Sequence, residues 1–292
     1  MRKFAFLSGL PRTGSTVLGT LLSQHPSLYP TSTSIVRDLT NTPYRFHLGE
    51  SPFYNTKDIN SPCWNIMRGI MTGAYQHVEE DKIVVEKDRG WAGNISKLSK
   101  LIQDKPKIIA TVRPVEEIIT SFILLSKKIG RKSKIDDEVR ALNRDMDNTN
   151  RARIIWEKYV YANWKTFKIG YEYDPSCFLL LNYEDITSHP QHVIDKISSF
   201  LEVDSFKVKT SGLYNPRPEN DEVYGLPGLH QVREELKRTS PPAEEVLGKE
   251  LCETWRQKRL NFWEYDALPI NVVIDPPKNE VPNPYTLTIP NK

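Results

Sequence analysis

Short apolar runs alternate along this chain with longer segments of helical periodicity. Four runs are largely apolar instead of alternating with polar residues: 3–7 (KFAFL), 82–85 (KIVV), 107–112 (KIIATV) and 177–182 (CFLLLN). Such runs are typical of strands that are covered on both faces. The pattern therefore predicts an α/β fold, with a central parallel sheet flanked by helices.

Helices are expected between these strands and after the last of them. The predicted helices cover 16–24, about 33–40, 63–79, 93–103, 115–128, 149–168, 190–201 and 242–262. The charge-rich run 127–140 (KKIGRKSKIDDEVR) predicts an exposed loop, and 205–241 is expected to be loop-rich.

The end of the chain differs in composition from the rest. Six of the 21 prolines fall at residue 269 or later. We therefore expect one domain over 1–265, followed by a proline-rich tail over 266–292 that is extended and lies on the surface or on a partner.

Composition narrows the class of protein. The 292 residues are 38% hydrophobic and 26% charged, which excludes a wholly disordered chain. The 40 basic and 37 acidic residues give a net charge of +3, so nothing indicates a nucleic-acid partner. No window approaches 18 apolar residues and the first apolar run is too short for a signal peptide, so neither a membrane span nor secretion is expected.

The three cysteines give no sign of a disulfide framework or a metal site. Cys63, Cys177 and Cys252 lie far apart, without CxxC or Cys/His metal spacing. A reducing, cytoplasmic setting is the expectation.

A glycine-rich loop follows the first predicted strand, where parallel sheets place ligands. The segment 9–16 (GLPRTGST) has the frame G-x-x-x-x-G-K-[ST], except that Ser15 replaces the lysine. Backbone N–H groups at a helix start, the forked Arg12 side chain and the hydroxyls of Thr13, Ser15 and Thr16 all favour a phosphate-like anion. The missing lysine removes the group that bridges the phosphates of a nucleoside triphosphate.

The segment LPRTGSTVLGTLLSQHP resembles the 5′-phosphosulfate loop of sulfotransferases, and most closely that of the tyrosylprotein and related bacterial branch. This family takes its sulfuryl group from 3′-phosphoadenosine 5′-phosphosulfate (PAPS), releases adenosine 3′,5′-bisphosphate (PAP) and needs no metal. The resemblance implies the P-loop sulfotransferase fold, which is similar to that of nucleotide kinases. It also implies that the 5′-phosphosulfate is held by Pro11, Arg12, Thr13, Gly14, Ser15 and Thr16.

A second anion site is expected after the strand 107–112. Arg113 ends this strand, and Ser121 follows eight residues later, about two turns into the helix that Pro114 opens. The two side chains can therefore face one crevice. The segment resembles the sulfotransferase pair that grips the 3′-phosphate of the donor. The alternative is that Arg113 pairs with Glu117 and Ser121 only packs in its helix.

Other site residues are implied by weaker similarity. Glu86-Lys87-Asp88 resembles the Asn-Lys-Asp-Pro segment whose lysine helps the sulfuryl group to leave, with Arg89 in place of the proline. Tyr183 resembles a tyrosine beside the nucleotide. The segment 225–247 resembles one that folds over the donor, which makes Lys237 and Arg238 candidates for the 3′-phosphate. The alternatives are that Lys87 belongs to a surface charge cluster, that Tyr183 is a core residue, and that Lys237 and Arg238 are solvated charges.

The base that takes the acceptor proton is not evident. The family's glutamate should follow the first helix, but 29–34 (YPTSTS) contains no acid. His230, Asp38, His47 and Glu50 are the candidates. His25, before Pro26, is expected to be a structural helix end.

We therefore expect a PAPS-dependent sulfotransferase in which Arg12, Lys87 and His230 are catalytic. The acceptor would be a hydroxyl or amine on a small molecule, carbohydrate or protein, and a homodimer is left open. Two alternatives remain: a kinase-like phosphotransferase with a degenerate loop, and a non-catalytic protein that binds a bisphosphorylated nucleotide.

Overall fold

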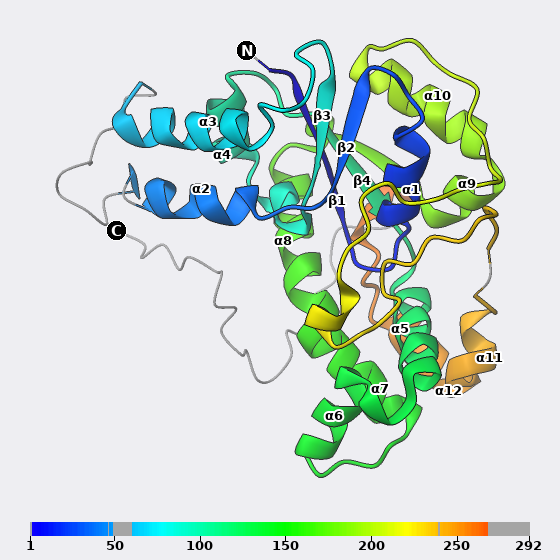
Figure 1. Cartoon of the computed structure of the whole chain (residues 1–292). Coiled ribbons are helices and arrows are strands. Elements are labelled where there is room, and N and C mark those ends of the chain that lie inside the picture. The colour runs from blue at the N-terminus through cyan, green and yellow to red at the C-terminus, as the bar shows by residue number, and fades with distance from the viewer. Residues whose placement is uncertain (1, 46, 49–59, 239, 268–292) are drawn as a thin grey trace.

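A single sheet forms the centre of the molecule (Figure 1). The computed structural model describes residues 2–45, 47–48, 60–238 and 240–267. Within them the sheet has five parallel strands in the order β2-β3-β1-β4-β5. The strands are β1 (Phe4–Gly9), β2 (Leu28–Thr33), β3 (Ile83–Lys87), β4 (Ile108–Val112) and β5 (Phe178–Asn182). The predicted α/β fold with a central parallel sheet is confirmed.

Helices cover both faces of this sheet. They are α1 (Ser15–Leu22), α2 (Val36–Arg45), α3 (Pro62–Ala74), α4 (Ile95–Ile102), α5 (Val115–Ile129), α6 (Lys134–Ala141), α7 (Asn148–Ile154), α8 (Tyr161–Tyr173), α9 (Tyr183–Ser188), α10 (Pro190–Leu201), α11 (Ala243–Leu247) and α12 (Lys249–Gln257). Alternate strand residues point to opposite faces. Leu7 packs with α1 and α10, whereas Phe6 packs with α3 and α4.

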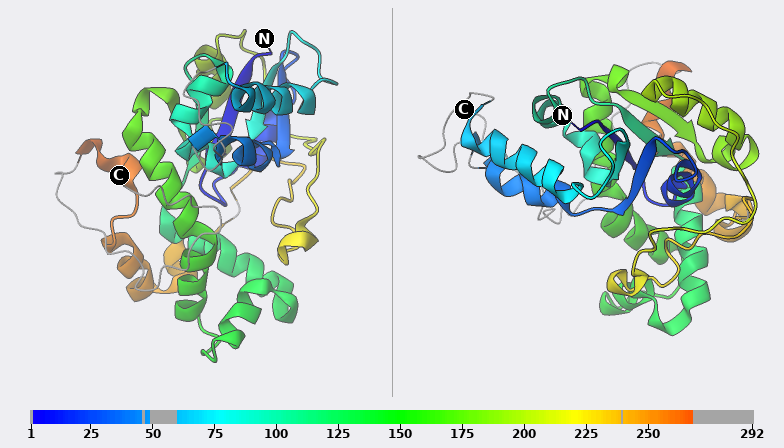
Figure 2. Two further views of the ribbon diagram at one scale, coloured as in Figure 1. Left: turned by 90° about the vertical axis from the view of Figure 1, so that its left-hand side faces the viewer. Right: turned by 45° about the horizontal axis from the view of Figure 1, so that its top comes forward.

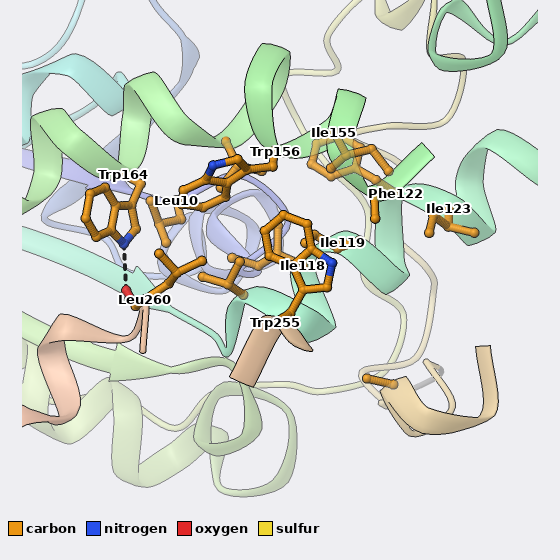
Figure 3. Packing of buried hydrophobic residues seen from close by; sticks show 14 of the residues in the cluster. Leu10, Ile118, Ile119, Phe122, Ile123, Ile155, Trp156, Trp164, Trp255 and Leu260 are labelled. Atoms are coloured by element: carbon orange, nitrogen blue, oxygen red, sulfur yellow. Dashed lines mark hydrogen bonds between the residues drawn. The ribbon is translucent and has the colours of Figure 1, made fainter. Parts of the chain in front are cut away.

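A third apolar cluster joins α5, α7, α8 and α12 beside the sheet (Figure 3). Trp156 contacts both Trp164 and Trp255 at ring-centre distances of 5.8 and 5.7 Å. The Trp164 indole N–H donates to the Leu260 carbonyl at 2.6 Å, which satisfies its one buried donor. This packing anchors α5, the helix that carries Ser121.

The edge strand β2 was not predicted from the sequence. Its six residues, LYPTST, are mostly polar and include Pro30. An edge strand tolerates both features, because one side of it pairs with no neighbour. The apolar signal that identified the central strands is therefore weak here.

The prediction of an exposed loop over 127–140 is wrong. Helix α5 continues to Ile129, and α6 follows after a short turn. Ile135 and Val139, four residues apart, are both fully buried. This helical spacing of two apolar side chains outweighs the surrounding charge.

Two predicted helices are divided. The segment 149–168 becomes α7, a π-helical turn over Ile155–Val160, and α8. The segment 242–262 divides at Gly248, where φ is 80°, into α11 and α12. The proline-rich tail falls outside the described residues from 268 onward.

The loop-rich segment 206–240 runs past one side of the sheet, from the end of α10 towards α6 (Figures 1 and 2). It contains a short 3₁₀ turn over Asp221–Tyr224, called η6 here. The amide of Lys134 in α6 donates to the Gly225 carbonyl at 3.2 Å. Glu219 of this segment also accepts hydrogen bonds from Thr33 and Lys87, the last residues of β2 and β3, so the segment lies over the carboxyl ends of these strands.

All three cysteines are buried and unpaired. Among the residues placed by the structure, no helix is both long and apolar enough to span a membrane.

Candidate active site

An open cleft lies at the carboxyl ends of the strands, with a volume of about 930 Å³ counted with its mouth. Its walls come from the loop after β1, from α5 and α9, and from the segment 206–240. The residues that line it include Arg12, Gly14, Ser15, Thr16, Arg89, Arg113, Ser121, Tyr183, Leu229, His230 and Lys237.

The loop between β1 and α1 is a tight turn that requires glycine. Gly9 has a φ of 118°, and a Cβ there would lie 2.5 Å from the Thr111 carbonyl oxygen. Gly14 has a φ of 89°, and a Cβ there would lie 2.9 Å from the Tyr183 ring. The first N–H groups of α1 have no partner within the helix, so they are free to bind an anion.

Two residues of this loop face inward. The hydroxyl of Thr13, fully buried, donates to the Leu10 carbonyl and bonds the Thr111 hydroxyl, both at 2.6 Å. Pro11 is also buried. Their side chains fix the loop, whereas Ser15 and Thr16 line the cleft.

Arg12 connects the loop to α5. Its Nε donates to the Ser121 hydroxyl at 3.1 Å, and its Nη1 donates to the Leu229 carbonyl. Burial and the nearby Arg113 lower the pKa of Arg12 to about 10, so it remains charged at neutral pH. The two segments that the sequence predicted to bind anions therefore meet in one cleft.

Arg113 is held from three sides. It donates to Glu117 at 3.0 Å and to the Arg12 carbonyl at 3.2 Å, and its guanidinium lies 4.2 Å from the centre of the Tyr183 ring. The Glu117 pair that the sequence left as an alternative is thus present, and Arg113 lines the cleft as well.

The two basic residues predicted near the 3′ site differ in their surroundings. Arg238 pairs with Glu117 at 3.2 Å and also with Glu184. Lys237 lines the cleft, but its side chain is 62% exposed and lies 3.6 Å from Glu235. Arg238 is therefore coupled to Arg113 through Glu117, and Lys237 is not.

Lys87 ends β3 and reaches the loop. Its Nζ donates to the Thr16 hydroxyl at 3.0 Å and to Glu219 Oε1 at 2.7 Å. Burial lowers its pKa, and Glu219 opposes this change. Lys87 borders a smaller cavity beside the main cleft, and both spaces share Ser15 and Thr16.

His230 lines the cleft and is held by Asp221. Its backbone N–H donates to Asp221 Oδ2 at 2.8 Å, and its ring Nδ1 lies 2.6 Å from Asp221 Oδ1. Glu219 Oε2 lies 3.4 Å from the same ring nitrogen. Burial and Lys87 lower the pKa of His230, which favours the neutral imidazole.

The other predicted bases lie elsewhere. Asp38 pairs with Arg37 at 2.7 Å, and His47 accepts from the Trp64 indole at 3.3 Å; neither lines the cleft. Glu50 falls outside the described residues. His25 bonds the Asp204 carbonyl at 2.7 Å near the end of α1, as a structural role requires.

The sequence did not identify three residues of this region: Arg89, Glu219 and Asp221. Arg89 lines the cleft, and its guanidinium makes no hydrogen bond or ion pair with the part of the chain that the structure describes. Its neighbour Asp88 pairs with Arg37 at 2.6 Å. For Arg89, the sequence offered one sign: it replaces the proline of the family's Asn-Lys-Asp-Pro segment. Glu219 and Asp221 lie in a segment without apolar periodicity, so no pattern singled them out.

Of two comparisons with known sequences, one found a match and the other found none. The sequence profile described as "Sulfotransferase family" matches residues 5–207. No curated protein sequence matches the chain.

Solved structures of sulfotransferases are similar to this chain. The sulfotransferase domain of the Synechococcus PCC 7002 olefin synthase is 18% identical, with 94% of this chain and 92% of that chain covered and a TM-score of 0.42. The domain from the curacin biosynthetic pathway is 15% identical, with 94% of both chains covered and a TM-score of 0.43. An Alicyclobacillus acidocaldarius sulfotransferase is 15% identical, with 76% and 88% covered and a TM-score of 0.41. Because the family profile matches more than half of its length, this chain belongs to the sulfotransferase family.

Proposed function

We propose that this protein transfers a sulfuryl group from PAPS to a hydroxyl or amine acceptor. The observation that carries the proposal is the 3.1 Å contact between Arg12 and Ser121, which brings the loop before α1 and the second turn of α5 into one cleft. A donor with anionic groups at both the 3′ and the 5′ position of one ribose needs two neighbouring anion sites at such a junction. A ligand with a single anionic end does not need both.

The residues present suit the two ends of this donor. The free N–H groups at the start of α1, with Ser15 and Thr16, would hold the 5′-phosphosulfate. Arg113 and Ser121 would hold the 3′-phosphate, with Arg238 nearby. Arg113 now pairs with Glu117, so binding the phosphate would replace a carboxylate by a more highly charged anion.

The transfer is an in-line displacement at sulfur. The acceptor oxygen forms the new S–O bond while the bond from sulfur to the 5′-phosphate oxygen breaks, and PAP leaves with that electron pair. Arg12 and Lys87 would offset the negative charge on the sulfuryl and bridging oxygens. The acceptor proton would pass to His230 Nε2, since Nδ1 is engaged by Asp221.

A second function is favoured by one observation. Lys87 donates to the Thr16 hydroxyl, so an ammonium group lies against the loop even though Ser15 replaces the lysine of the motif. A kinase-like phosphotransferase needs such a group, and it also needs ATP and magnesium. The nucleotide and metal requirements therefore separate the two functions.

The test is release of PAP from PAPS in the presence of phenols, sugars, amines and tyrosine peptides, with EDTA present. We expect release that depends on one acceptor class and persists in EDTA. No release with any acceptor, together with no binding of PAP, would contradict the proposal. ATP turnover that requires magnesium would support the kinase-like alternative.

A further inference from the structure

An acidic side chain reaches the stretch where the family's glutamate is missing. The residues of β2, up to Thr33, contain no acid. Yet Glu219, from the distant segment 206–240, accepts a hydrogen bond from the Thr33 backbone N–H at 3.2 Å. A carboxylate is therefore present beside β2, although it comes from another part of the chain.

This carboxylate is shared between two groups of the site. Glu219 Oε1 accepts from Lys87 Nζ at 2.7 Å, while Oε2 lies 3.4 Å from His230 Nδ1. Oε2 is buried and has no hydrogen-bond partner among the residues that the structure describes, and the side chain is 7% exposed. Glu219 lines the smaller cavity that Lys87 borders, and not the main cleft that His230 lines. Glu219 is therefore placed to act through Lys87 and His230.

Asp221 fixes the orientation of the imidazole. Its two oxygens bind the backbone N–H and the ring Nδ1 of the same histidine, at 2.8 and 2.6 Å. An ionised carboxylate only accepts hydrogen bonds, so Nδ1 must carry the hydrogen. The lone pair of the neutral ring is then on Nε2.

We propose that Asp221 and Glu219 are positioning residues that make His230 the proton acceptor, in place of the glutamate absent after the first helix. This inference rests on the proposed function. Asp221 sets the tautomer, and Glu219 orients Lys87 and supplies a second negative charge beside the ring. When the acceptor O–H proton arrives on Nε2, two carboxylates on the Nδ1 side of the ring stabilise the imidazolium. The proton leaves to solvent after the product, and Lys87 stays protonated throughout.

Charges from several elements face this imidazole. Lys87 comes from β3, Arg89 follows it, and Tyr224 of η6 packs at a ring-centre distance of 5.7 Å. Burial and the cations lower the pKa of His230, whereas Glu219 and Asp221 raise it. Removing either carboxylate should therefore lower that pKa, and removing Lys87 should raise it.

The test is an NMR titration of protein labelled with ¹³C and ¹⁵N in histidine, with the His230 signal assigned from the His230→Gln spectrum. In the unsubstituted protein we expect the Nδ1–H tautomer at pH 7.5. Glu219→Gln should lower the His230 pKa by about one unit, as loss of an opposite charge at this distance does. Asp221→Ala should lower it too and should admit the Nε2–H tautomer.

Glu222→Gln is the matched control, because Glu222 lies in the same 3₁₀ turn and is exposed. It should leave the titration unchanged. An Nε2–H tautomer in the unsubstituted protein, or a Glu219→Gln titration equal to that of Glu222→Gln, would overturn the proposal. The tautomer of His230 is measured in the unsubstituted protein, so the proposal is testable even if Asp221→Ala does not fold.

Calorimetry with PAP on the same samples separates this inference from the proposed function. PAP binding with an unresponsive His230 would overturn the inference alone. No PAP binding would overturn the proposed function, whatever His230 does.

Discussion

The two ends of the cleft are built in different ways. At the donor end, Arg113 directly follows β4, Arg12 lies in the short loop between β1 and α1, and Tyr183 opens the helix after β5. At the reaction end, Lys87 is paired with Glu219, 132 residues away in the chain. The residues of the first end are thus positioned by local strand–turn–helix geometry. Those of the second end are brought together by the way a long segment docks over the sheet.

The two ends also differ in charge. The donor end is rich in guanidinium groups, which stay protonated across the physiological range. At the reaction end, Glu219 lies 2.7 Å from the Lys87 ammonium and 3.4 Å from the His230 imidazole, which in turn lies 2.6 Å from Asp221. We therefore expect pH to act on the reaction end and substitution of arginine to act on the donor end.

The largest expected effect separates catalysis from binding. His230→Gln should lower the rate of PAP release by roughly 10²- to 10⁴-fold, the usual contribution of a general base. The affinity for PAP should stay within about twofold, because His230 belongs to the reaction end. Initial rates and calorimetry measure the two quantities. Equal losses of rate and PAP affinity would show that the two ends are not separate.

The next effect concerns the donor end. Arg113→Ala should weaken PAP binding roughly 10- to 100-fold, because charged hydrogen bonds of about 1.5–3 kcal/mol are lost. Lys127→Ala is the control, since Lys127 is an exposed cation on the same helix. Calorimetry should show no change for the control. If Arg113→Ala binds PAP as tightly as the unsubstituted protein, the 3′ site is misplaced.

Backbone geometry should matter at the same end. Gly14→Ala places a Cβ 2.9 Å from the Tyr183 ring at a φ of 89°. We expect a loss of stability of about 2 kcal/mol, a fall in Tm of roughly 5 °C and weaker PAP binding. Gly19→Ala, inside α1 and with Leu7 3.9 Å from its Cβ, should be neutral or stabilising. Equal melting temperatures for the two variants would contradict the strained-loop account.

A pH dependence of stability is expected beneath the reaction end, and it should leave PAP binding at the donor end unchanged. Burial raises the pKa of Glu86, the residue before Lys87, to about 7. The folded state then binds a proton that the unfolded state releases, so the stability from this group is complete below pH 4.5 and falls as pH rises through 7. Glu86→Gln should remove this decline in the free energy of unfolding, which is at most ~3 kcal/mol. Melting temperatures between pH 5 and 8 check this, and parallel curves for both proteins would contradict it.

Residues that the sequence predicted to lie together line one cleft where the signal is local. The loop 9–16 and the pair Arg113 and Ser121 lie inside single strand–turn–helix units, so their spacing defines their geometry. His230 came from a loose similarity, and nothing in its segment indicated Asp221 or Glu219. These contacts depend on long-range docking of a segment without apolar periodicity, which sequence spacing does not encode.

The same distinction explains which strands and helices the sequence failed to predict. Central strands buried on both faces needed apolar runs and were predicted, whereas β2 lies at the edge and needs few apolar residues. In α6, Ile135 and Val139 were hidden among charges, because two buried positions suffice for an otherwise exposed helix.

The central claim is that one nucleotide bridges two anion sites without a metal. Calorimetry of PAP, 5′-AMP and 3′-AMP in the presence of EDTA tests it most directly. The account predicts that PAP binds at least ~100-fold more tightly than either monophosphate, because each end contributes its own charged hydrogen bonds. Binding of 5′-AMP as tight as that of PAP, or binding of PAP that appears only with magnesium, would contradict it.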